Sequence, residues 1–405
     1  MQSFDSKGQF SLSRVRSPRY QPWASARTLH FTAILFFSCW TGSVAALPSL
    51  DTLLNPIRQQ YHLPALAAAV VVDGEVQAAG AVGVRKEGAT RRVRLSDRWH
   101  IGSCTKSMTA SLAGLLIQEG RFEWTTPVGE LFPDLRDAMQ AEWRSATLEQ
   151  LLKNQAGAPE SLDKDGLWTL LWLRHGLPAM EQRSMLARVL LTKQTPQDAP
   201  GTHFRYSNAG FALAGHAIEL KLGTPWETLL VKRLARPIGL RSVGFGCTAS
   251  PGKLNGPWGH HRDDTGVNVP DEPGPNGDNP AAIGPGGTVH CTILDLARYA
   301  RWHLRGARGQ GTLLRPETFS RLHQPYRGGG ATTYAGGWNV VPRAWGDGEV
   351  LTHNGSNTKN FAVIWIAPKR NFAVVVCTNL GGDVAAQATD ETAAALIRKY
   401  LTQGK

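Results

Sequence analysis

Ser103 and Lys106, three residues apart, are the pair in this sequence best suited to covalent chemistry. Apolar residues recur at helical spacing from Met108 to Leu115, and Gly120 is a typical stop, so the segment predicts a helix. Positions three apart on a helix project from one face. A serine hydroxyl needs a base to take its proton, and desolvation lowers the pKa of a lysine from about 10. The pair therefore favours acyl-transfer chemistry, although so short a pattern also arises by chance.

Cys104 is an alternative nucleophile, because it directly follows Ser103. It lies one residue round the helix, off the face shared with Lys106, so we favour the serine. The chain has five cysteines and no C-x-x-C, which argues against zinc ribbons and thioredoxin-like chemistry. Cys247 and Cys291 lie near loops, and a disulfide between them is the alternative to two free thiols.

Tyr206 and Asn208 lie two residues apart in a turn that leads into a helix predicted over 211–222. Both side chains point into one cleft if this turn lines it; the ordinary alternative is an asparagine turn beside a packing tyrosine. His260 and His261 raise the question of a metal site. They lack H-x-x-x-H spacing and a further ligand cluster, so we predict no metal and no other cofactor.

Residues 1–45 have the composition of a signal peptide. Basic residues precede a short apolar stretch at 31–37, and Ser43-Val44-Ala45 resembles a cleavage site. The apolar stretch is too short to span a bilayer. We therefore expect export to the periplasm or the medium, with an uncleaved anchor or a lipoprotein attached at Cys39 as alternatives.

The charge of the chain gives no sign of a nucleic-acid partner. The 405 residues carry a formal net charge of +12, and removal of residues 1–45 leaves 39 basic and 31 acidic residues, or +8. The densest basic cluster, 91–94, is short and lacks interleaved aromatic residues. No internal repeat and no membrane span is evident after residue 45. The pattern is that of a basic globular enzyme, and it leaves the oligomeric state open.

Strand patterns at both ends of the chain enclose a mainly helical middle, which predicts an α+β fold. Asp73-Gly74 joins two apolar runs as a hairpin, and a second pair of runs follows near the C-terminus. A segment rich in Gly, Pro and Asp at 251–290 predicts a long stretch of irregular structure. The predicted strands are 65–72, 75–84, 349–352, 361–367 and 371–378, and the predicted helices include 51–61, 160–195, 293–304 and a last helix capped by Asp383.

Three short motifs stand in order along the chain, and together they are far more specific than each alone. Their order and spacing resemble those of the serine β-lactamase and penicillin-binding-protein superfamily. The Tyr-x-Asn form resembles the class C branch, which also holds DD-carboxypeptidases, D-aminopeptidases and esterases. The resemblance covers residues 50–402. The motifs are Ser103-x-x-Lys106, Tyr206-x-Asn208 and His353-x-Gly355.

The resemblance implies a β-lactamase/transpeptidase-like α+β fold over residues 46–405. A central antiparallel sheet comes from about 46–102 and 331–405, and a helical subdomain is inserted at about 103–330. It also implies a small-molecule or peptidoglycan-derived substrate. Motifs of other hydrolases, G-x-S-x-G and H-E-x-x-H, are absent from the sequence.

The resemblance also implies a role for each motif residue. Ser103 attacks a carbonyl carbon to form an acyl-enzyme, and Lys106 and Tyr206 share the proton transfers. Asn208 hydrogen-bonds the substrate and holds Lys106. The backbone N–H groups of Ser103 and Ser356 form an oxyanion hole. His353 and Gly355 edge the cleft, and Gly355 allows the close approach of substrate.

Two departures from the family pattern bear on the substrate. His353 stands where β-lactamases carry a lysine, and a neutral histidine is a poor partner for the antibiotic carboxylate. The stretch 152–157 departs from the usual Thr-His-Thr-Ser-Gly-like sequence. We therefore expect a hydrolase of esters or of D-amino-acid-containing peptides and amides. The alternatives are a true class C-type β-lactamase and a penicillin-binding module that acylates with little turnover.

Overall fold

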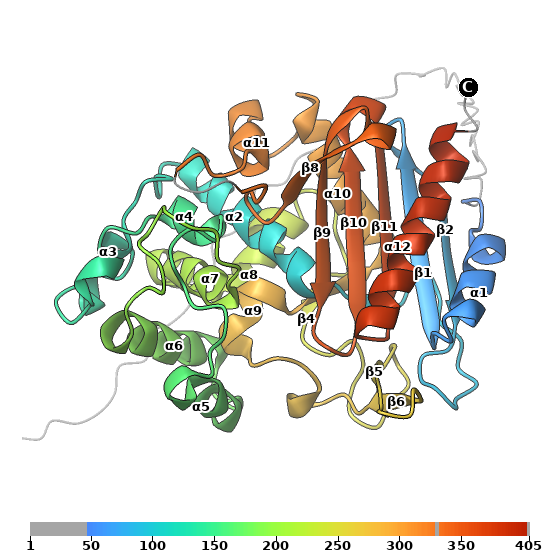
Figure 1. Ribbon diagram of the computed structural model, residues 1–405, viewed down its shortest axis with the longest axis horizontal. Coiled ribbons are helices and arrows are strands. Elements are labelled where there is room, and N and C mark those ends of the chain that lie inside the picture. The colour runs from blue at the N-terminus through green and yellow to red at the C-terminus, as the bar shows by residue number, and fades with distance from the viewer. Residues whose placement is uncertain (1–46, 329–331, 403–405) are drawn as a thin grey trace, which may run out of the picture. The chain divides into compact units, whose positions relative to one another are not determined.

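Apolar runs from the two ends of the chain form one six-stranded antiparallel sheet (Figure 1). The structure, a computed structural model, describes residues 47–328 and 332–402. The strand order is β2-β1-β11-β10-β9-β8, so the two N-terminal strands join the four C-terminal strands through the pairing of β1 with β11. This confirms the predicted α+β class. The strands are β1 (Ala65–Val72), β2 (Glu75–Gly83), β8 (Asn339–Arg343), β9 (Gly348–Ser356), β10 (Phe361–Ala367) and β11 (Phe372–Thr378).

Helices cover both faces of this sheet, which explains why its central strands are apolar throughout. In Figure 1, α10 (Ile293–Ala307) lies behind the sheet, while α1 (Asp51–Gln60) and α12 (Asp383–Ile397) lie in front. Alternate residues of β1 face opposite sides. Ala67 packs in the core that includes α10, and Ala68 packs in the core that includes α12.

The helical part of the chain surrounds α2 (Thr105–Gln118), the helix that follows Ser103. Its first twelve residues are all buried, where the sequence predicted a single apolar stripe. Gly120 adopts φ +71°, as expected for a helix stop. The other helices are α3 (Val128–Leu131), α4 (Leu148–Leu152), α5 (Leu167–Leu173), α6 (Ala179–Lys193), α7 (Asn208–Leu222), α8 (Trp226–Leu229), α9 (Gly284–Gly287) and α11 (Pro316–His323).

The starts of α7 and α12 differ from the prediction, whereas α10 begins at Ile293 as predicted. Ser207 caps α7 by accepting from the Gly210 N–H, so the helix begins at Asn208. Thr292 caps α10 by accepting from the Asp295 N–H, and the Asp295 carboxylate accepts from the Ser242 hydroxyl. At α12, the cap position is Gly382, and Asp383 is the first helical residue.

Smaller elements lie outside the main sheet. β3 (Arg98–His100), β7 (Val289–Thr292) and β4 (Gly244–Phe245) form a three-stranded sheet. The segment predicted to be irregular contains a hairpin of β5 (Gly259–Arg262) and β6 (Asn268–Asp271). No helix within the described ranges is long and apolar enough to cross a membrane. The predicted signal peptide, with Cys39, lies outside the described residues.

Candidate active site

Ser103 sits in a tight turn between β3 and α2, pressed against the end of β9. Gly102 adopts φ +48°, and a Cβ there would lie 2.3 Å from the Ser356 nitrogen. A Cβ on Gly355 would lie 1.9 Å from the Ile101 carbonyl oxygen. Backbone therefore meets backbone, and no side chain fits between the two segments. Gly355 thus lies in close contact with the nucleophile turn, a neighbour that the sequence did not predict.

The Lys106 ammonium lies at the centre of the motif residues. Its Nζ donates to Ser103 Oγ at 3.1 Å, to Asn208 Oδ1 at 2.6 Å and to the Gly286 carbonyl at 2.8 Å. The side chain is fully buried, and its polar partners are all uncharged oxygens. Burial without a counter-charge lowers the pKa of Lys106 to about 7. Near neutral pH, a large fraction of Lys106 is therefore free to accept the Ser103 proton.

Gly286 is a site residue that the sequence interpretation missed. Its carbonyl is the third hydrogen-bond acceptor of the Lys106 amine. A Cβ on Gly286 would lie 3.2 Å from Asn208 Oδ1. The residue belongs to the run Gly284-Pro285-Gly286-Gly287, which forms α9. This glycine-rich run is the sequence feature that could have identified Gly286, because glycines allow a backbone to approach buried side chains closely.

The Tyr206-x-Asn208 motif brings both of its side chains to Lys106. Asn208 opens α7 and accepts from Lys106, while the Lys106 Nζ lies 4.6 Å from the centre of the Tyr206 ring. Burial raises the pKa of Tyr206, and a hydrogen bond to Ser103 opposes that shift. The phenol therefore keeps its proton near neutral pH, when Lys106 is the group that titrates.

Cys104 is excluded as the alternative nucleophile by its surroundings. The thiol is fully buried and donates to the His353 carbonyl at 3.4 Å, on the side of β9. Burial raises the pKa of Cys104 to about 12. Because a thiolate is the reactive form of cysteine, this side chain is inert at neutral pH.

His353 is a buried, neutral histidine whose two ring nitrogens are both engaged. Nδ1 lies 2.5 Å from the Asn354 carbonyl, so it carries the proton, and Nε2 accepts from the Tyr334 hydroxyl at 2.9 Å. Burial and the nearby Lys106 lower the pKa of His353 to about 3. The side chain thus provides no positive charge at neutral pH.

His100 connects the two segments that meet at Ser103, and the sequence interpretation missed it. Its Nδ1 accepts from the Gly102 N–H at 3.1 Å, and its Nε2 donates to Asp278 at 2.9 Å. The second oxygen of Asp278 accepts from the Asn357 side chain at 2.9 Å. His100 and Asp278 are buried, so this chain links the nucleophile turn to the residue after Ser356.

The divergent stretch at 152–157 supports the Tyr206 turn. Asn154 adopts φ +56°, its side chain accepts from the Ser207 N–H at 3.1 Å, and its carbonyl accepts from the Arg205 N–H at 2.8 Å. Gly157 adopts φ +70°, and a Cβ on it would clash with the Asp198 carbonyl. The residues of 152–157 that depart from the family pattern therefore hold the turn that carries Tyr206 and Asn208.

The structure bears on two further sequence predictions. Cys247 and Cys291 are free, so the alternative of a disulfide between them is wrong. His260 is held between the Glu87 N–H and the Asn379 carbonyl. The part of the chain that the structure describes contains no group of three His, Cys, Asp or Glu residues placed to hold a metal ion.

Comparison with known proteins agrees with this geometry. The family model described as Beta-lactamase matches residues 50–399. Penicillin-binding protein 4 of Amycolatopsis lactamdurans is 27% identical over 357 residues, covering 83% of this chain and 86% of the relative. The octameric penicillin-binding protein homologue of Pyrococcus abyssi superposes with a TM-score of 0.69 at 22% identity, covering 87% and 78% of the two chains. D-alanine carboxypeptidase AmpC of Burkholderia cenocepacia gives 0.65 at 20% identity, covering 86% and 97%.

The site and the match over most of the chain define a β-lactamase/transpeptidase-like fold. This chain belongs to the Beta-lactamase family, within the serine β-lactamase and penicillin-binding-protein superfamily.

Proposed function

We propose that this protein is an exported serine hydrolase that forms an acyl-enzyme at Ser103 and acts on esters or on D-amino-acid-containing peptides and amides. One observation carries the proposal. The amine of Lys106, buried among uncharged oxygens with its pKa lowered to about 7, lies 3.1 Å from the Ser103 hydroxyl. A general base is most effective when its pKa is close to the working pH.

The proposed reaction has two halves. Neutral Lys106 takes the Ser103 proton as Oγ bonds to the substrate carbonyl carbon, and the Tyr206 hydroxyl passes a proton to the leaving group as its bond breaks. Lys106 then passes its proton to Tyr206, which restores both groups. Water attacks the acyl-enzyme as neutral Lys106 takes one of its protons, and Lys106 gives that proton to Ser103 Oγ as the acid is released. The backbone N–H groups of Ser103 and Ser356 stabilise the oxyanion in both halves, and each such donor contributes about 3–4 kcal/mol in known cases.

His353 is the residue that favours esters and D-peptides over β-lactams. β-Lactamases use a lysine at this place, according to the resemblance, to bind the carboxylate of the antibiotic. Here the ring is neutral, and both nitrogens are already hydrogen-bonded. The carboxypeptidase named among the similar structures supports the D-amino-acid arm of the proposal.

A serine-directed fluorophosphonate probe tests the nucleophile. The purified protein is expected to take up one equivalent, mapped by mass spectrometry to the peptide that contains Ser103. Ser103→Ala is the test variant, and Ser107→Ala is the matched control, because Ser107 lies one helical turn further on with its hydroxyl bonded to the Cys104 carbonyl. Labelling that survives in Ser103→Ala contradicts the proposal.

A parallel substrate panel separates the proposed activity from its rivals. p-Nitrophenyl esters, peptides ending in D-Ala-D-Ala and a chromogenic cephalosporin are compared by kcat/KM. We expect the ester or the peptide to be turned over fastest. Preferred turnover of the cephalosporin identifies a true β-lactamase, and a stable adduct without product release identifies a penicillin-binding module with little turnover.

A further inference from the structure

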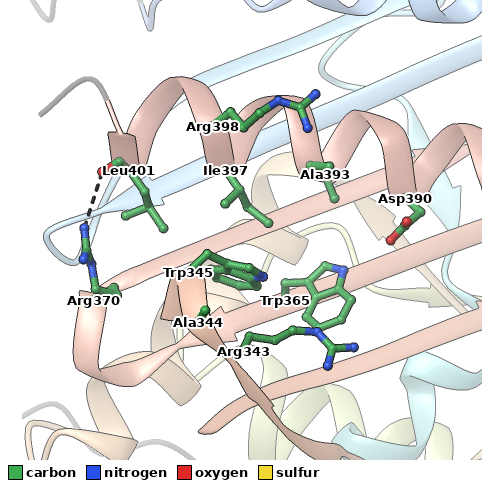
Figure 2. Close-up of a pocket in the computed structure, with 11 residues that line it drawn as sticks. Arg343, Ala344, Trp345, Trp365, Arg370, Asp390, Ala393, Ile397, Arg398 and Leu401 are labelled. Atoms are coloured by element: carbon green, nitrogen blue, oxygen red, sulfur yellow. Dashed lines mark hydrogen bonds between the residues drawn. The ribbon is translucent and has the colours of Figure 1, made fainter. Parts of the chain in front are cut away.

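A cavity of about 610 Å³ lies on the face of the sheet covered by α12, and the three motifs contribute nothing to its lining. Figure 2 shows two indole rings beneath α12: Trp345, from the turn between β8 and β9, and Trp365, from β10. Their ring centres lie 5.9 Å apart at 73°. Ile397 and Leu401 form the apolar wall opposite. This volume falls in the range of small-molecule sites, about 300–1,000 Å³.

Both tryptophans are only partly buried, although complete burial of an indole is strongly favourable. A contiguous apolar surface with polar groups at its rim is characteristic of a ligand-binding groove. The space beneath α12 therefore has an aromatic wall formed by the two indoles.

The rim of the cavity is mainly cationic. Arg343, Arg370 and Arg398 line it, and Asp390 is the single acidic residue among the lining side chains. The Arg343 guanidinium lies 5.4 Å from the centre of the Trp365 ring, on the indole side of the cavity. Arginine beside an aromatic surface is suited to a carboxylate whose body is apolar, because the guanidinium pairs with the oxygens while the rings cover the hydrocarbon.

We propose that this cavity is a binding site for a small apolar carboxylate, separate from the catalytic site. The apolar body of the ligand lies between the two indoles and the wall of α12, and its carboxylate pairs with Arg343. A fatty acid and an aromatic acid share this chemistry.

Isothermal titration calorimetry on the purified protein tests the proposal. The probes are dodecanoate and 1-naphthoate as the two kinds of carboxylate, with dodecanol as the uncharged control. At least one carboxylate is expected to bind saturably, and dodecanoate is expected to bind more tightly than dodecanol. Arg343→Glu should weaken carboxylate binding about tenfold and leave dodecanol binding unchanged, since only the ion pair is affected.

Arg136→Glu is the matched control, because Arg136 is an exposed arginine remote from the cavity lining, and it should change affinity less than twofold. Trp365→Leu should weaken the acid and the alcohol alike. Arg343 is exposed, so its variant is informative even if Trp365→Leu fails to fold. Ester turnover by Arg343→Glu should equal that of the parent protein, which separates this site from Ser103. The absence of saturable binding, equal binding of dodecanol, or carboxylate binding unaffected by Arg343→Glu overturns the proposal.

Discussion

His100 accepts the backbone N–H of Gly102 at 3.1 Å, so a buried imidazole holds the turn immediately before the nucleophile. The same ring donates to Asp278, which in turn binds Asn357 on the loop after β9. In the proposed mechanism, the two oxyanion donors belong to these two segments. The distance between these two N–H donors therefore depends on a series of hydrogen-bonded side chains that contacts neither the substrate nor the reacting atoms.

Removal of this support is expected to slow catalysis more than it weakens binding. His100→Ala should lower kcat for an ester about 10- to 100-fold with little change in KM, because misplaced donors lose transition-state contacts. His100→Asn should restore part of the rate, since its Oδ1 can replace Nδ1 as the acceptor for Gly102. Equal kcat in the parent and His100→Ala, with both folded by circular dichroism, would refute the positioning role.

The pH dependence of acylation reports Lys106. Because the base must be neutral, the rate should rise about tenfold per pH unit below pH 7 and level off above it, following the lowered pKa of Lys106. Tyr206 has a raised pKa and His353 a pKa of about 3, so neither adds an inflection between pH 5 and 9. Pre-steady-state ester cleavage measures this profile. A rate that falls from pH 6 to pH 8 contradicts the assignment of the base.

The contact between Gly102 and Ser356 predicts an asymmetry between two glycine substitutions. Gly102→Ala combines a positive φ with a steric clash, and we expect a loss of about 2–4 kcal/mol in the free energy of unfolding and of most activity. Gly88 has φ +75° and open space around it, so Gly88→Ala isolates the backbone strain, about 1 kcal/mol. Chemical denaturation compares the two variants. Similar losses in both would show that the close backbone contact is unimportant.

The four described cysteines are predicted to react as free thiols in order of exposure. Cys247 is half-buried and should be alkylated first by iodoacetamide in the native protein, whereas the other three, all buried, should react only after unfolding. Intact-mass spectra with and without reductant provide the readout. A mass difference of two hydrogens on reduction would reveal a disulfide and contradict the structure.

The sheet and the local motifs could be predicted because their signals lie close together in the sequence. The Asp73-Gly74 turn adopts positive φ at both residues, and the strands at 65–72 and 361–367 have the predicted bounds. Ser103 and Lys106 are one helical turn apart, so their contact follows from local geometry alone.

The parts that could not be predicted depend on long-range contacts. Gly286 is 180 residues from Lys106, and Asp278 is 178 residues from His100, so no periodicity connects them. The burial of α2 on all sides could not be predicted for the same reason, because the elements that cover it come from distant parts of the chain. The contact of Gly355 with the nucleophile turn could not be predicted either, because only the fold brings these two segments together.

Trapping of the acyl-enzyme tests the central claim most directly. The protein is mixed with an activated ester, quenched in acid within the first turnover, digested and mapped by mass spectrometry. We expect one acyl group on Ser103, absent in Ser103→Ala, and formed at least 100-fold more slowly when Lys106 is replaced by Met. No adduct on Ser103, or an adduct on the neighbouring Cys104, would contradict it.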